Sequence, residues 1–243
     1  MDELSVSFDF EGGSGTLVEV NPESKRISID LGQEGLFASH GFALSATTSR
    51  DLSNVTVTIR NAWQSPFARG WVGYRSYFQD QSGQWHRIDN GTYDGKQYSF
   101  RVGLCAGSTM LAWFPQYHSD RLSLFVEDHK LSNWSVEVEE GITQLRIGTA
   151  EKPTVLIVAR QHPGESMASF CIEGLLSKVS DLDGGPEAQY VIFPMLNMDG
   201  LRGGRHRLDC SNVDLNRAWD RDDILAIARV RRAIEGLKHL ALV

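Results

Sequence analysis

The chain has 243 residues, a formal net charge of −7 and only three cysteines. Its apolar content of 41% and charged content of 23% are ordinary for a globular protein with a full core, in one large domain or two smaller ones. The negative charge argues against a binder of nucleic acid or of an anionic membrane surface, because both partners are polyanions.

The ends of the sequence and its cysteines indicate a compartment. The longest apolar run is far shorter than a membrane span, and the acidic segment Met1–Ser5 lacks the basic and apolar regions of a signal peptide. Cys105, Cys171 and Cys210 are widely spaced and odd in number, which is typical of neither a disulfide framework nor a paired-cysteine metal site. We therefore expect a cytoplasmic protein with no membrane or nucleic-acid partner.

The first half of the chain predicts an all-β sandwich domain over residues 1–114. Short alternating segments are separated by turns such as Asp80–Gly83 and Asp89–Gly91 at regular intervals. The predicted strands are 17–20, 25–30, 42–47, 54–61, 74–79, 85–87 and 97–102. Met110–Tyr117, which contains Pro115, is predicted to be a hinge between the halves.

The second half, residues 115–243, predicts an α/β domain because strands alternate with helices. Helices are predicted over 119–130, 166–180 and 222–236, and strands over 134–139, 142–147, 155–159, 188–195 and 239–243. In the helix over 166–180, the stripe predicted to be buried consists of Met167, Phe170, Cys171, Gly174, Leu175 and Val179.

The segment around which this second half is organised is Pro153–Glu165. Val155–Ala159 is a continuous apolar run rich in β-branched residues, which predicts a strand buried on both faces. It is followed by His162-Pro163-Gly164-Glu165. An imidazole and a carboxylate at the carboxyl end of a strand can reach one metal ion, and this mixed donor set suits zinc. The alternative is a plain turn with two solvated polar side chains, because the His-x-x-Glu pattern is common by chance.

A second polar cluster follows the strand over 188–195. It contains Asn197-Met198-Asp199-Gly200, a loop rich in arginine, and Asp214–Trp219. The cationic residues are Arg202, Arg205, His206, Arg207 and Arg217, and together they predict a pocket for a carboxylate or an oxyanion. An equally good interpretation is a solvated loop whose arginines pair with Asp199, Asp209, Asp214 and Asp220.

Together, the two clusters resemble motifs of the zinc metallocarboxypeptidase family, in its cytosolic-carboxypeptidase-like branch. His162–Glu165 resembles the HPGE zinc motif, and Asp214–Trp219 resembles the DLNRxW segment. Asn197–Gly200 resembles the NPDG turn, with Met198 in place of the usual proline. Trp113–Tyr117 resembles the junction that follows the N-terminal β-sandwich of that branch. Three ordered motifs are far more specific than one.

The resemblance implies a carboxypeptidase-like α/β domain with a mixed sheet and a role for individual residues. His162 and Glu165 would bind one Zn²⁺ ion, and Arg207 would stabilise the oxyanion that develops from the scissile carbonyl. Asn216 and Arg217 would bind the free C-terminal carboxylate of a peptide or protein substrate. Arg202 and Arg205 match no family role, but they could favour substrates that end in glutamate.

Two parts of a hydrolytic zinc site have no match in this sequence. Such a site needs a third protein ligand and a nearby base. In the family the third ligand follows the next strand, whereas His239 begins the predicted strand 239–243 and therefore lies at the wrong end. We expect the chain to be a fragment or truncated product of the enzyme, inactive by itself. We also expect a half-finished sheet to associate with a partner or a second copy.

Two other functions remain open at this stage. The first is a non-catalytic module that binds C-termini through Asn216 and Arg217. The second is an N-acyl amino-acid deacylase, because related amidohydrolases also combine His-x-x-Glu with a downstream Asn-Arg pair. That group usually has neither the sandwich domain nor the Asn-x-Asp-Gly turn, so it ranks lowest.

Overall fold

The computed structural model describes residues 4–129, 134–182 and 186–237. The chain divides into two compact units, of which the first comprises Met1–Gln116 and Leu201–Asn212. The second comprises Tyr117–Gly200 and Val213–Val243. The arginine-rich loop therefore belongs to the same unit as the N-terminal strands, although it lies among the α/β elements in the sequence.

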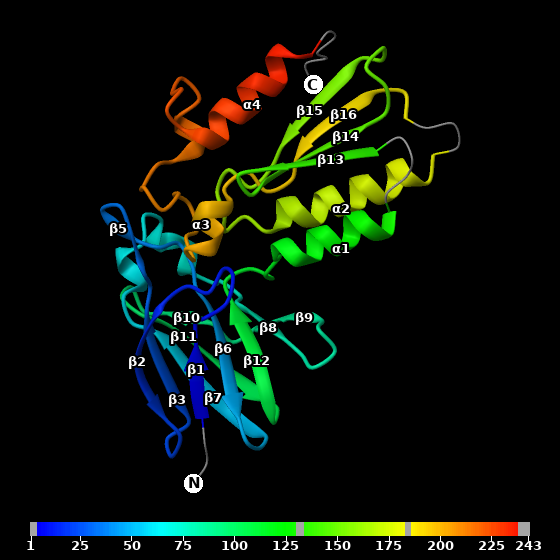
Figure 1. Ribbon diagram of the computed structural model, residues 1–243. Coiled ribbons are helices and arrows are strands. Elements are labelled where there is room, and N and C mark those ends of the chain that lie inside the picture. The colour runs from blue at the N-terminus through cyan, green and yellow to red at the C-terminus, as the bar shows by residue number, and fades with distance from the viewer. Residues whose placement is uncertain (1–3, 130–133, 183–185, 238–243) are drawn as a thin grey trace. The chain divides into compact units, whose positions relative to one another are not determined.

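The first unit contains two five-stranded sheets (Figure 1). One has the order β1 (Leu4–Ser7), β6 (Ala43–Thr48), β12 (Gly107–Ala112), β8 (Tyr77–Gln79), β9 (Trp85–Arg87). The other has the order β10 (Thr92–Tyr93), β11 (Tyr98–Leu104), β7 (Leu52–Ile59), β3 (Arg26–Asp30), β2 (Thr16–Asn21). Two short strands, β4 (Gln33–Glu34) and β5 (Phe37–Ala38), form a separate antiparallel pair.

The core of this unit is built from alternate residues of both sheets. Val57 of β7 and Phe100 of β11 are buried from the second sheet, and Leu44 of β6 and Leu111 of β12 are buried from the first. This period of two is what the sequence pattern predicted for the strands. Burying one such side chain stabilises the fold by roughly 1.5–3 kcal/mol.

The predicted hinge at Met110–Tyr117 is wrong at its beginning. Residues up to Ala112 belong to β12, which pairs with β6 on one side and β8 on the other. Leu111 and Ala112 are fully buried. The prediction failed because the apolar segment was interpreted together with Pro115, which lies beyond the end of the strand.

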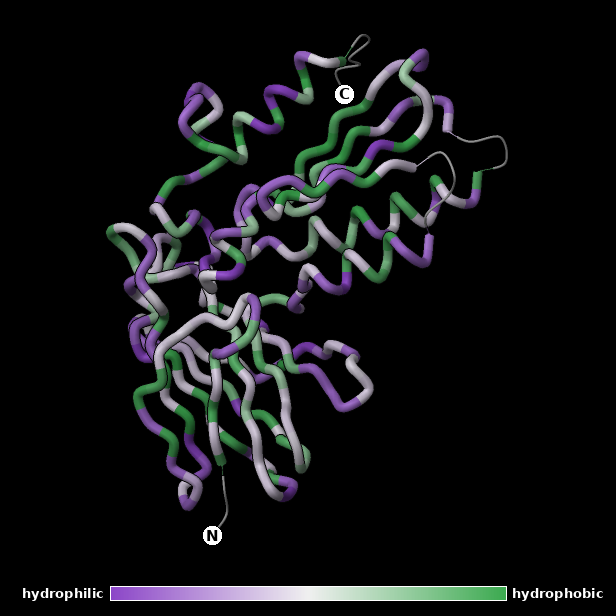
Figure 2. Tube along the Cα trace, in the orientation of Figure 1, coloured by the Kyte–Doolittle hydropathy of each residue, from purple (hydrophilic) through white to green (hydrophobic). Residues whose placement is uncertain are grey.

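The second unit contains a mixed four-stranded sheet, as the sequence predicted (Figure 1). Its order is β13 (Trp134–Glu139), β14 (Ile142–Ile147), β16 (Gln189–Phe193), β15 (Thr154–Val158). β15 and β16 are parallel, and the other pairs are antiparallel. Helices α1 (Ser119–His129) and α2 (Met167–Ser180) cover one face of the sheet, and α4 (Leu225–Glu235) covers the other. Figure 2 shows hydrophobic residues along the central strands between these helices.

Two predictions about burial in this unit are wrong. Val155–Val158 are only half-buried, because in the described sheet β15 has a neighbour on its β16 side alone. In α2 the buried residues are Ser169, Ile172, Leu176 and Val179, so only Val179 of the predicted stripe is buried.

The strand predicted over 239–243 lies outside the described residues.

None of the helices in the described ranges combines the length and the apolar character needed to cross a lipid bilayer.

Candidate metal and carboxylate site

The site begins at the carboxyl ends of β15 and β16, which meet at one edge because the two strands are parallel. The pairing continues past both strands, since Leu196 N donates to Ala159 O (3.0 Å) and Asn197 N donates to Arg160 O (3.0 Å). The Asn197 side chain donates to Gln161 O (3.0 Å) and accepts from Gly200 N (2.9 Å). Asn197 therefore ties the loop that carries His162 to the turn after β16.

A buried arginine supports the turn from behind. Arg160 is 4% exposed and has a φ of 55°, a left-handed conformation that is uncommon outside glycine. Its guanidinium donates to Pro163 O through Nε (2.7 Å) and also through Nη2, and Nη1 donates to Ser169 Oγ (3.1 Å). The side chain thus connects the turn to the first turn of α2. This role of Arg160 was not predicted from the sequence.

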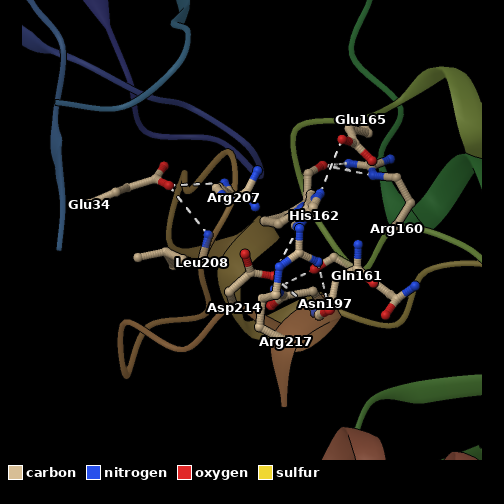
Figure 3. Close-up of polar contacts among 12 residues, drawn as sticks. Glu34, Arg160, Gln161, His162, Glu165, Asn197, Arg207, Leu208, Asp214 and Arg217 are labelled. Carbon is tan, nitrogen blue, oxygen red and sulfur yellow. Dashed lines mark hydrogen bonds and ion pairs between the residues drawn. The ribbon is translucent and has the colours of Figure 1, made fainter. Parts of the chain in front are cut away.

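His162 and Glu165 lie together as the sequence predicted. His162 Nδ1 is 3.1 Å from Glu165 Oε1 (Figure 3). The His162 side chain is 10% exposed and the Glu165 side chain 55% exposed, so the pair opens towards solvent on the carboxylate side. The turn is closed by Glu165 N, which donates to His162 O (3.2 Å).

The opposite face of the imidazole contacts a third residue, Asp214. His162 Nε2 is 2.9 Å from Asp214 Oδ1, and the Asp214 side chain is 15% exposed (Figure 3). The hydrogen bond to Glu165, together with that to Asp214, raises the pKa of His162 above its ordinary value, although burial acts in the opposite direction. Asp214 was part of a recognised motif, but a spacing of 52 residues in sequence does not reveal this contact.

This arrangement fits a metal ligand pair supported by a second carboxylate. A histidine that ligates a metal through one ring nitrogen usually donates its other N–H to a carboxylate, which fixes the tautomer. Here Glu165 lies at Nδ1 and Asp214 at Nε2, so one ion at Nδ1 can be shared by His162 and Glu165 but not by Asp214. Within the described parts of the chain, no group of three His, Cys, Asp or Glu side chains is placed to hold a metal ion.

Asn216 and Arg217 lie directly after Asp214, in a short 3-10 helix (η3, Leu215–Arg217). Asp214 caps this helix, since its Oδ1 accepts from Asn216 N (3.0 Å). Both Asn216 and Arg217 are exposed, and Arg217 Nη1 donates to Asn216 O (2.8 Å). Trp219 Nε1 donates to Gln161 Oε1 (2.9 Å), which connects this segment to the His162 loop. Exposed amide and guanidinium groups can receive an anionic ligand.

Arg207 belongs to the first unit, because its loop, Leu201–Asn212, is held by the N-terminal strands. Arg207 N donates to Glu34 Oε2 (2.9 Å), and the neighbouring residues of the loop bind the same carboxylate. Glu34 was not singled out in the sequence.

Comparison with known proteins connects both units to peptidases. The sequence pattern of the family described as "Cytosolic carboxypeptidase N-terminal domain" matches residues 6–114. Cytosolic carboxypeptidase 1 of Danio rerio is 38% identical over 88 residues, which are 33% of this chain and 7% of that protein. An uncharacterised protein of Zymomonas mobilis is 23% identical over 232 residues, which cover 89% of this chain and 59% of that protein. The chain thus spans a small part of the first relative and little more than half of the second.

A crystal structure with the same fold is that of a metallo-carboxypeptidase. The metallo-carboxypeptidase from Burkholderia cenocepacia superposes with a TM-score of 0.87 at 26% identity, covering 98% of this chain and 69% of that one. The fold is therefore that of a metallocarboxypeptidase. The chain therefore resembles the cytosolic carboxypeptidases in its N-terminal domain and the metallocarboxypeptidases in its fold.

Proposed function

We propose that this chain provides the metal-binding and carboxylate-binding half of a zinc-dependent carboxypeptidase. The reaction is hydrolysis of the last peptide bond of a peptide or protein in the cytoplasm. The observation that carries the proposal is the position of His162 between two carboxylates, with Glu165 at Nδ1 (3.1 Å) and Asp214 at Nε2 (2.9 Å). In a plain solvated turn, the imidazole would be exposed to water, whereas that of His162 is buried and has a carboxylate at each ring nitrogen.

The metal ligands in this proposal are His162 and Glu165. A bound zinc ion supplies Lewis-acid catalysis. Asp214 accepts a hydrogen bond from His162 Nε2, which keeps Nδ1 unprotonated and directed at the metal position. Arg160 holds the Pro163 carbonyl, so the turn between the two ligands keeps its shape when the metal enters.

The chain's other site residues act on the substrate. Asn216 and Arg217 bind the free C-terminal carboxylate, which restricts the reaction to the end of a chain. Arg207 stabilises negative charge on the scissile carbonyl oxygen. A preference for C-terminal glutamate follows if Arg202 lines the side-chain subsite. Arg205 is less suited, because its guanidinium already donates to Gln33 O.

Two protein ligands are fewer than the three of ordinary hydrolytic zinc sites. We therefore propose that this chain alone binds zinc more weakly than a complete site and has little or no turnover. We also propose that residues 1–114 form the sandwich domain and residues 115–243 the start of the catalytic domain.

The proposal is tested by binding peptides of one sequence, with either a free or an amidated C-terminus, to the zinc-supplemented chain. We expect binding of the free acid only, and we expect Arg217→Ala to weaken it about tenfold or more, because a charged hydrogen bond contributes about 1.5–3 kcal/mol. Arg231→Ala is the matched control, since Arg231 pairs with Asp222 on the surface of α4. Equal binding of acid and amide would contradict the assignment.

An activity assay with the same peptides separates the enzyme from the alternatives. Release of the last residue, with a higher rate for glutamate than for leucine, supports a catalytic chain with acidic preference. Binding of the free acid without turnover supports the incomplete zinc site if His162 is needed for zinc binding, and it supports the non-catalytic module if the chain binds no zinc. Hydrolysis of N-acylated amino acids but not of peptides supports the deacylase.

A further inference from the structure

The carboxylate of Glu34 lies at the end of the short strand β4 and is almost completely buried. Its residue is 7% exposed. The carboxylate accepts hydrogen bonds from four donors, which are Ser39 Oγ (2.9 Å) and the backbone N–H groups of His206, Arg207 (2.9 Å) and Leu208 (3.3 Å). Figure 3 shows Glu34 reaching the backbone at Arg207 and Leu208.

This is an unusual partner set for a buried carboxylate. Removing a negative charge from water is costly unless hydrogen bonds compensate, and bonds to an ionised acceptor are stronger than those between neutral groups. Three consecutive backbone N–H groups of one loop provide that compensation here. Because neither oxygen can be moved without losing a donor, the carboxylate fixes the path of residues 206–208.

The same loop is held at both flanks by residues next to Glu34. On one side, Arg205 donates to Gln33 O, and on the other, Gly35 N donates to Asn212 Oδ1 (3.1 Å). Gly204 packs so closely that a Cβ there would lie 2.0 Å from Gly13 O. Hydrogen bonds across some 172 residues of sequence therefore attach the whole segment to the first unit.

We propose that Glu34 is the positioning residue for Arg207. The Glu34 carboxylate binds the backbone N–H of Arg207 itself, so it sets the position from which the guanidinium extends. Glu34 lies in the segment matched over residues 6–114, so a side chain of the N-terminal domain holds the Arg207 loop. The role of Arg207 in transition-state stabilisation rests on the proposed function, whereas the anchoring of its loop does not.

The anchoring is tested by hydrogen–deuterium exchange on the full 243-residue chain and on Glu34→Gln. Glutamine keeps the length of the side chain but presents an NH₂ group to backbone N–H donors. We expect exchange of the amides at 206–208 to rise about tenfold or more, while those of β7 and β11 keep their rates. Glu19→Gln on the exposed face of β2 is the charge-matched control and should change neither.

Two exchange results would overturn the anchoring. One is an unchanged rate at 206–208 in Glu34→Gln. The other is an equal acceleration throughout the first unit, which would make Glu34 a general stability element.

The link to catalysis is tested by a double-mutant cycle in the zinc-supplemented peptidase assay. Glu34→Gln should lower kcat with little change in KM, and it should add no further loss to Arg207→Ala. Additive losses would overturn the positioning role. A wild-type chain without any turnover agrees with the two-ligand site of the proposed function, and the exchange measurement then decides the anchoring independently. In that case, the reactivity of the Arg207 guanidinium towards phenylglyoxal replaces the rate. It should change in Glu34→Gln while that of exposed Arg101 stays constant, and an unchanged reactivity at Arg207 would overturn the proposal.

Discussion

Replacing Asp214 by asparagine removes the negative charge behind His162 while leaving the local structure intact. Asp214 Oδ1 accepts from both His162 Nε2 (2.9 Å) and Asn216 N (3.0 Å), and an asparagine Oδ1 can retain both hydrogen bonds. What is lost is the charge, in a place where the two side chains are only 10% and 15% exposed. Loss of such an outer carboxylate typically weakens metal binding about 10- to 100-fold, which corresponds to roughly 1.4–2.7 kcal/mol.

The assay is a zinc titration in competition with a chromogenic chelator, at a pH where His162 is neutral in both proteins. We expect Asp214→Asn to weaken zinc binding within that range without changing the unfolding temperature in the metal-free state by more than a few degrees. Asp220→Asn, an exposed carboxylate in the same segment, is the control. If Asp214→Asn bound zinc as tightly as the wild type, the inference that Asp214 orients His162 and places a negative charge beside its imidazole would be refuted.

Four further outcomes are expected. Arg160→Lys should lower the free energy of unfolding by about 1–3 kcal/mol and weaken zinc binding, because an ammonium group cannot bind Pro163 O and Ser169 Oγ of α2 together. Denaturant unfolding measures the first effect, and a zinc titration measures the second. The raised pKa of His162 stabilises the metal-free fold below the unfolded pKa of about 6.5 and loses this contribution as the pH rises through the folded value. Zinc binding has the opposite pH dependence, because protons compete with zinc for His162 Nδ1. Zinc affinity should therefore fall as the pH falls through that raised pKa. Equal affinities at pH 5.5 and pH 8 would contradict this expectation. The position of β15 at the edge of the sheet, among the described residues, predicts self-association. Light scattering should detect it as a concentration-dependent mass, whereas a monomer at all concentrations would argue against it.

The sequence alone was sufficient for most of the regular elements. The strands predicted over 134–139 and 142–147 coincide with β13 and β14, and the helix predicted from Ser119 is α1, with Lys130 outside the described residues. These segments have clear periodicity and are bounded by turn residues. The pairing of His162 with Glu165 could also be predicted, because both lie in one turn and depend only on local structure.

Periodicity failed where a segment is apolar on several sides. In α2, Met167, Phe170 and Leu175 form one helical stripe, and Ile172 and Leu176 belong to another that overlaps it. Only the packing of the sheet decides between them, and it buries the second stripe while leaving Met167 exposed. A pattern within one helix does not contain that information.

The parts of the site that the sequence could not reveal are those that join distant segments. Asp214 contacts His162 across 52 residues, and Glu34 binds the Arg207 loop across more than 170. No spacing rule connects such positions without an alignment. Arg160 was overlooked for another reason, since an arginine next to a strand end is ordinarily exposed, whereas this one is buried under the turn.

The most direct test of the central claim is the zinc stoichiometry of the purified chain and of His162→Ala, measured by titration under excess metal. His86→Ala is the matched control, because His86 also pairs with a carboxylate, at 2.6 Å from Asp80 Oδ2, but lies in a hairpin of the first unit. We predict one equivalent of zinc for the wild type and for His86→Ala, and none for His162→Ala at the same metal concentration. Zinc retained by His162→Ala, or no zinc bound by the wild type, would contradict the assignment of His162 and Glu165 as metal ligands.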